Sequence, residues 1–130
     1  MRLLLGVALG SALGSVLRYG AERIHARIHA RTPQRLLHPD LPWATLVVNV
    51  VGSALLGAVL AMHAAGHLGE ITTAALGAGV AGGLTTFSTF AFDVFRLVRN
   101  GQWRLATAYA GANLVLGTAA AAVGFRLAGG

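Results

Sequence analysis

The chain has 130 residues, of which 55% are hydrophobic and only 11% are charged. Soluble domains carry about 25% charged residues, so this composition excludes a water-exposed surface and, with it, a soluble globular enzyme. All ten basic residues are arginines, four residues are acidic and none is cysteine, which excludes disulfides, thiol catalysis and cysteine-based zinc sites.

Four apolar stretches are long enough to cross a bilayer, which takes about 20 residues. They are residues 3–22, 43–63, 71–98 and 104–126. The first is not a signal peptide, because it ends in Arg18 and Tyr19 and three more spans follow. The sequence therefore predicts an all-α integral membrane protein with a single four-span domain over residues 1–130.

The arginines gather on one side of the predicted membrane. Seven lie at the first and third connections, namely Arg23, Arg27, Arg31, Arg35, Arg96, Arg99 and Arg104. Only Arg2 and Arg126 lie on the opposite side. By the positive-inside rule, both termini are expected outside the cytoplasm. In so apolar a chain, the basic excess indicates membrane flanks rather than a nucleic-acid surface.

Small residues recur every fourth position in three of the spans. The stripes are Gly6, Gly10 and Gly14, then Asn49, Ser53 and Gly57, then Asn113, Gly117 and Ala121. Small residues let helix backbones approach closely in lipid. The stripes can assemble one subunit or join two copies. Because four short helices enclose little volume, we expect an oligomer.

The third span carries an expected helix break. Gly82 and Gly83, followed by Thr85 and Thr86, weaken a helix, because glycine costs about 1 kcal/mol relative to alanine. Carbonyls freed in hydrocarbon must be satisfied by protein, water or a cation. The break therefore indicates either a site where carbonyls meet a small cation or a kink that only helps packing.

Aromatic and hydroxyl side chains follow this break. Phe87 and Phe90 are three positions apart and share a helix face. A phenylalanine ring has a positive edge, which can attract an anion, although packing against lipid or the core is the ordinary role of such a pair. Ser88 and Thr89 offer hydroxyl donors, or bond back to preceding carbonyls.

Polar residues also occur inside the second and fourth spans. An intramembrane amide such as Asn49 must be paired, so its NH2 group donates either to an anion or to another helix. Asn113 is interpreted in the same way, and Tyr109 and Thr45 each lie one turn before an asparagine. Asp93, the one acid well inside a span, either caps a helix, pairs with an arginine or lies near the interface.

Motifs in all four spans resemble those of one family. They are Gly10-x-x-x-Gly14-x-x-x-Arg18-Tyr19, the run from Pro42 to Asn49, the run GGLTTFSTF over residues 82–90, and Tyr109-x-x-x-Asn113. The family is that of the CrcB/Fluc fluoride channels, and the third-helix run is its most specific signature. Two positions depart from the family pattern. Ala44 replaces a usual glycine, and Ala91 replaces a serine, which removes one hydroxyl from the polar track.

The resemblance implies an antiparallel dimer of four-helix subunits in the bacterial plasma membrane, with two pathways for passive fluoride export and no enzymatic activity. It implies a structural sodium ion at the dimer centre, held by the backbone carbonyls of Gly82 and Thr85. The residues expected along the fluoride pathway are Arg18, Thr45, Asn49, Phe87, Ser88, Thr89, Phe90, Tyr109 and Asn113. Within this set, Asn49 donates to the ion, the two phenylalanines present ring edges and Arg18 lies near a vestibule.

Three further possibilities concern partners and function. The arginine asymmetry favours one fixed orientation and pairing with an oppositely oriented paralogue, rather than a dimer of identical chains. A small dimeric proton-coupled multidrug exporter would need a carboxylate within the membrane, for which Asp93 is the sole candidate. A non-transporting scaffold subunit would explain the small-residue stripes but not the polar and aromatic run over residues 85–90.

Overall fold

A computed structural model describes residues 1–31 and 40–129, and for residues 29–31 it describes the backbone alone. The elements are α1 (Arg2–Arg31), α2 (Trp43–Ala64), α3 (Glu70–Ala74), the π-helix η1 (Ala75–Ala81), α4 (Gly82–Leu84), α5 (Phe87–Arg99) and α6 (Trp103–Gly129). Four helices are long and apolar enough to cross a membrane, counting α3 to α5 as one interrupted helix. The all-α expectation is confirmed. The side chain of Arg31, and Arg35 as a whole, lie outside the described residues.

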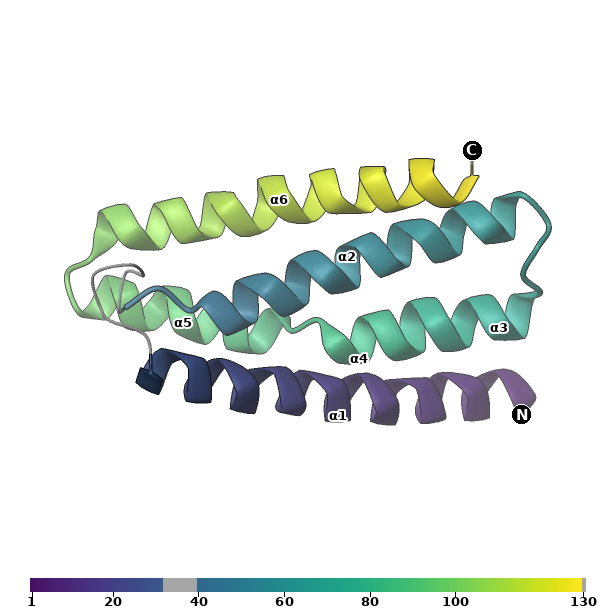
Figure 1. Cartoon of the computed structure of the whole chain (residues 1–130), viewed down its shortest axis with the longest axis horizontal. Coiled ribbons are helices and arrows are strands. Elements are labelled where there is room, and N and C mark those ends of the chain that lie inside the picture. The colour runs from purple at the N-terminus through teal and green to yellow at the C-terminus, as the bar shows by residue number, and fades with distance from the viewer. Residues whose placement is uncertain (32–39, 130) are drawn as a thin grey trace.

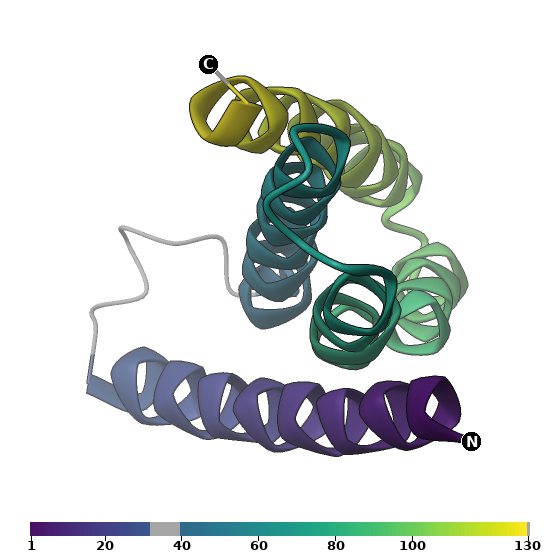
Figure 2. The same cartoon turned by 90° about the vertical axis from the view of Figure 1, so that its right-hand side faces the viewer.

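The four long helices run in alternating directions along the length of the molecule (Figure 1). Both termini lie at the same end, together with the connection from α2 to α3 (Figure 1). In the perpendicular view, α2 lies between α6 and the interrupted third helix, and α1 crosses below (Figure 2). The packing follows this arrangement, because α2 packs mainly on α6, and α1 packs mainly on η1 and α4.

The small-residue stripes on α2 and α6 face each other turn by turn. Asn49 bonds Asn113, the Ser53 hydroxyl lies against Gly117, and an added Cβ on Gly57 would overlap the backbone of Ala121. The stripe on α1 packs on the third helix in the same way, since a Cβ on Gly14 would overlap Val80 and Leu84. The stripes therefore serve assembly within one subunit, as close backbone packing in lipid requires.

The break in the third helix falls at Thr85 and Thr86, not at the two glycines. Thr85 (φ −74°, ψ 157°) and Thr86 (φ −147°, ψ 116°) are extended, whereas Gly82 (φ −65°, ψ −38°) is helical. The expected break in the third helix is confirmed, but it lies at the threonines of the predicted segment and not at its glycines. Gly83 remains helical and lets α1 approach, because a Cβ there would overlap the backbone of Ser11.

Candidate functional site

An open groove of about 650 Å³ lies along the break, between α2, the third helix and α6. Six of the residues singled out from the sequence line it, namely Asn49, Gly82, Thr85, Phe87, Phe90 and Asn113. Gly52, Ser53 and Thr86 line it as well, and the sequence did not indicate them as site residues. Segments far apart in the chain therefore contribute to one surface.

The side chain of Asn49 replaces the helix hydrogen bonding that the break removes. Its Oδ1 accepts the backbone N–H of Thr86 at 2.9 Å, a group that an unbroken helix would pair with the carbonyl of Gly82. Its Nδ2 donates to Asn113 Oδ1 at 3.1 Å and, over a long 3.5 Å, to the carbonyl of Thr86. Asn113 in turn donates to the carbonyl of Tyr109 at 3.0 Å. The amide of Asn49 is therefore held in a fixed orientation.

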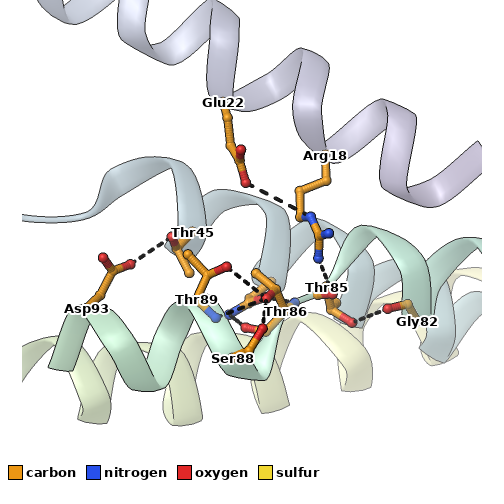
Figure 3. Close-up of polar contacts among 10 residues, drawn as sticks. Arg18, Glu22, Thr45, Gly82, Thr85, Thr86, Ser88, Thr89 and Asp93 are labelled. Carbon is orange, nitrogen blue, oxygen red and sulfur yellow. Dashed lines mark hydrogen bonds and ion pairs between the residues drawn. The ribbon is translucent and has the colours of Figure 1, made fainter. Parts of the chain in front are cut away.

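Thr86 is the N-cap of α5, a role that the sequence-based expectations for this residue did not include. Its side chain is buried, with the residue 6% exposed, and its Oγ1 accepts the backbone N–H of Thr89 at 3.2 Å. The same Oγ1 lies 3.0 Å from Thr89 Oγ1 and 3.3 Å from Ser88 Oγ, as Figure 3 shows. Threonine before a helical run is a known N-cap signal, which could have identified it. Ser88 and Thr89 therefore bond to the cap, and neither lines the groove.

Thr85 and Arg18 occupy the other side of the break (Figure 3). The hydroxyl of Thr85 donates to the carbonyls of Ala81 at 3.0 Å and Gly82 at 3.3 Å. Arg18 on α1 donates to the carbonyl of Thr85 at 3.4 Å and lies 4.0 Å from the carboxylate of Glu22. The break therefore has partners from both α1 and α2.

The two phenylalanines have different surroundings. Phe87 is 80% exposed, and its ring centroid lies 5.9 Å from that of Phe90. The other side of Phe90 packs on Tyr109, at a centroid distance of 5.6 Å, and Tyr109 is only 1% exposed. Phe87 is thus free to face a partner or an ion, whereas Phe90 also belongs to the core.

Thr45 and Tyr109 do not line the groove but converge on Asp93 behind Phe90. The Thr45 hydroxyl donates to Asp93 Oδ2 at 2.9 Å, and the Tyr109 hydroxyl donates to the same atom at 3.5 Å. Arg96 lies 3.7 Å from the other carboxylate oxygen. Of the alternatives left open for Asp93, the structure therefore shows pairing with an arginine, and this buried carboxylate does not line the groove.

A cation at the break could bind backbone carbonyl oxygens. Within residues 1–31 and 40–129, no three His, Asp or Glu side chains gather as a metal site. Gly82 lines the groove, and its carbonyl accepts a long 3.3 Å hydrogen bond from the hydroxyl of Thr85. Carbonyl oxygens suit small hard cations. The carbonyl oxygen of Gly82 is thus a suitable ligand for such an ion, whereas the carbonyl oxygen of Thr85 already accepts a hydrogen bond from the guanidinium of Arg18.

Comparisons with known proteins agree on one family. The profile described as "CrcB-like protein, Camphor Resistance (CrcB)" matches residues 5–125. The chain is 40% identical over 96 residues to the "Fluoride-specific ion channel FluC" of Thermus thermophilus, covering 74% of this chain and 76% of the relative. It is 39% identical over 94 residues to "Fluoride-specific ion channel FluC 1" of Nitrobacter hamburgensis, covering 72% and 75%. A FluC protein of Deinococcus radiodurans is 45% identical over 83 residues, covering 64% and 66%.

Proposed function

The chain belongs to the CrcB-like family of membrane proteins, and on that basis we propose that it is a fluoride-specific ion channel. It is a multi-pass membrane protein and not an enzyme, and it lets fluoride leave a bacterial cell passively. The observation that carries the proposal is the groove at the break, where amide and aromatic side chains from three spans meet. The similarity to relatives that are named fluoride-specific ion channels supports the same function.

The chemistry of the groove suits fluoride, a small and strongly hydrated anion. A channel must offer binding that is favourable enough to admit the ion and weak enough to release it. Ring edges carry a partial positive charge, so the exposed ring of Phe87 and the adjacent ring of Phe90 attract an anion without holding it as a fixed cation would. We assign these two rings to the fluoride pathway, because both line the groove.

Asn49 supplies an amide donor at the same place. One of its N–H groups is bound to Asn113 at 3.1 Å, while the other makes only the long 3.5 Å contact with the carbonyl of Thr86. Fluoride can take over this weaker bond without disturbing the 2.9 Å bond that holds the break. Asn113 orients the amide, and Ser88, Thr89, Thr45 and Tyr109 belong to the hydrogen-bonded surroundings of the pathway.

The open groove and the exposure of Phe87 also favour a dimer. An antiparallel partner would cover this face and complete two pathways, one on each side of the contact. A structural sodium ion at the dimer centre would supply positive charge and tie the two breaks together. Gly82 is the better supported of its two proposed ligands, and Thr85 would share its carbonyl between the ion and Arg18.

The partner in this dimer is either a second copy or an oppositely oriented paralogue. Seven arginines on one side against two on the other favour one fixed orientation, and hence the paralogue. A cytoplasmic or external tag at the C-terminus reports orientation in cells. One orientation, together with flux that requires the sister chain, supports pairing. An even split with full activity from this chain alone contradicts it.

The proposed function is tested by fluoride efflux from liposomes that contain the purified protein, with its paralogue where one is required. We expect fluoride to leave rapidly once an ionophore balances the charge, while chloride is retained. Protein-free liposomes give the background leak. Equal release of fluoride and chloride, or no fluoride release from correctly folded dimers, would overturn the assignment.

A further inference from the structure

The C-terminal third of α1 extends beyond the hydrocarbon. The helix has 30 residues, so it is about 45 Å long at about 1.5 Å per residue, whereas the hydrocarbon core is about 30 Å thick. If the span begins at Leu3, the core ends near Glu22. The part of α1 that follows, including Arg23 and Arg27, then lies at the level of the lipid headgroups.

This end of α1 has little packing against its own subunit. A Cβ added at Gly20 would meet no atom within 4 Å, and Tyr19 and Ile24 are 61% and 58% exposed. Among the described residues α1 and α5 do not pack together, and Figure 2 shows the C-terminal end of α1 directed away from α5. The surface is thus open to another molecule.

One face of α1 is apolar inside the membrane and basic beyond it. Leu9, Leu13 and Val16 are exposed on this face. Arg27 follows Leu9 by 18 positions, roughly five turns of 3.6 residues each, and so lies on the same line of the helix. Arg23 lies one turn before Arg27.

Among the residues that the structure describes, the two arginines have no acidic partner. Glu22, the acid of this segment, lies by Arg18, and within residues 1–31 and 40–129 no carboxylate lies within ion-pair distance of Arg23 or Arg27. The guanidinium of Arg23 lies 5.9 Å from the ring centroid of Tyr19, and tyrosine is typical of the membrane interface. Two exposed guanidinium groups therefore lie directly above an apolar, lipid-facing surface.

We propose that this face of α1 binds an anionic phospholipid, with acyl chains along Leu9, Leu13 and Val16 and the phosphate on Arg23 and Arg27. Arginine matches the geometry of a phosphate with paired N–H groups. Basic residues at a membrane surface attract anionic headgroups, and a net negative lipid such as phosphatidylglycerol complements two unpaired cations better than zwitterionic phosphatidylcholine does. The site lies apart from the groove and does not depend on fluoride conduction.

Native mass spectrometry of the delipidated dimer tests this proposal. It counts bound lipids directly, so the result does not depend on membrane orientation or on fluoride flux. The protein is titrated with phosphatidylglycerol or with phosphatidylcholine of the same chains. We expect phosphatidylglycerol to be retained with about a fivefold preference per arginine. The double variant Arg23→Gln/Arg27→Gln should lose this preference, and Arg23→Lys/Arg27→Lys should keep most of it.

The matched control is Arg2→Gln/Arg126→Gln, which removes the same charge at the other end of the subunit and should leave the preference unchanged. Size-exclusion chromatography establishes that each variant remains a folded dimer. Equal retention of the two lipids by the unaltered protein would overturn the proposal. So would an undiminished preference in the glutamine variant, or an equal loss in the control.

Discussion

The side-chain oxygen of Asn49 accepts the backbone N–H of Thr86 at 2.9 Å, which ties α2 to the interrupted third helix at its break. The two residues are 37 positions apart. One amide thus stabilises the broken backbone through its oxygen and faces the groove through its nitrogen. We therefore expect fold and conduction to be coupled at this side chain. Substitutions that keep the amide oxygen but remove the nitrogen donor can distinguish the two roles.

Asn49→Asp and Asn49→Ala should separate these two roles. The aspartate keeps the oxygen that accepts from Thr86 but loses the donor to Asn113. The thermal unfolding midpoint in detergent should therefore fall less than in the alanine variant, while the negative charge in place of the donor strongly reduces fluoride efflux. The alanine leaves a buried N–H unpaired, which costs about 1–3 kcal/mol, so both stability and flux should fall. Equal unfolding midpoints for the two variants would contradict the proposed role of the oxygen.

Phe87→Ile should reduce fluoride efflux without affecting the fold of the subunit. The ring is 80% exposed, so its removal creates no cavity, whereas isoleucine has no positive ring edge to present to an anion. Loss of an interaction worth about 1.4 kcal/mol in the transition state lowers a rate about tenfold, and we expect a fall of at least that order in liposome efflux.

Phe92→Ile is the matched control for this substitution. Phe92 is on the same helix, is 63% exposed and does not line the groove. Its replacement should leave fluoride efflux unchanged. If both variants lose flux to the same extent, the effect comes from packing against lipid or a partner, and the assignment of Phe87 is wrong.

Thr86→Val should destabilise α5 at its start. Valine has nearly the same shape but no oxygen to accept the N–H of Thr89, and loss of an N-cap costs about 1 kcal/mol. Thr86→Ser retains the oxygen and should have an unfolding midpoint close to that of the unaltered protein. Ser88→Ala removes an exposed hydroxyl that is not the cap. A midpoint as low for Ser88→Ala as for Thr86→Val would contradict the capping role.

The sequence predicted the helices well because their signals are local. Span length and hydropathy identified all four membrane-crossing helices, and the period of four in the stripes indicated close backbone contacts. The pairing of the stripes on α2 and α6 could not be predicted. The contact of Asn49, Ser53 and Gly57 with α6 depends on the parallel packing of two helices that are far apart in the chain. The same limit applies to Asp93, whose partner Thr45 is 48 positions away.

The position of the break shows how tertiary contacts override propensity. Glycine weakens a helix in isolation, so the sequence favoured Gly82 and Gly83. In the fold, Gly83 is helical and packs closely on Ser11, while Thr86 caps α5 with its own side chain and donates its backbone N–H to the oxygen of Asn49. The cap comes from the side chain of Thr86, and threonine is an ordinary residue within a membrane span. The second interaction comes from Asn49 on α2, which is distant in the sequence.

Substituting the two glycines one at a time tests this account. An added Cβ at Gly83 would overlap the backbone of Ser11, which cannot move aside as a flexible side chain can. Gly83→Ala should therefore separate α1 from α4 and lower the unfolding midpoint. At Gly82 the nearest atom to an added Cβ is the carbonyl of Gly77 at 3.8 Å, so the subunit itself accepts alanine, which also has the higher helix propensity.

Gly82→Ala should act only where subunits meet. If the carbonyl of Gly82 holds a sodium ion at the dimer centre, a methyl group beside it crowds the partner. The variant should then remain folded by circular dichroism while dimerisation, followed by subunit exchange in detergent, needs more sodium than in the unaltered protein. Replacing sodium by a bulky organic cation should weaken the unaltered dimer in the same assay. Dimerisation that is insensitive to sodium in both proteins would remove the ion from the proposed interface.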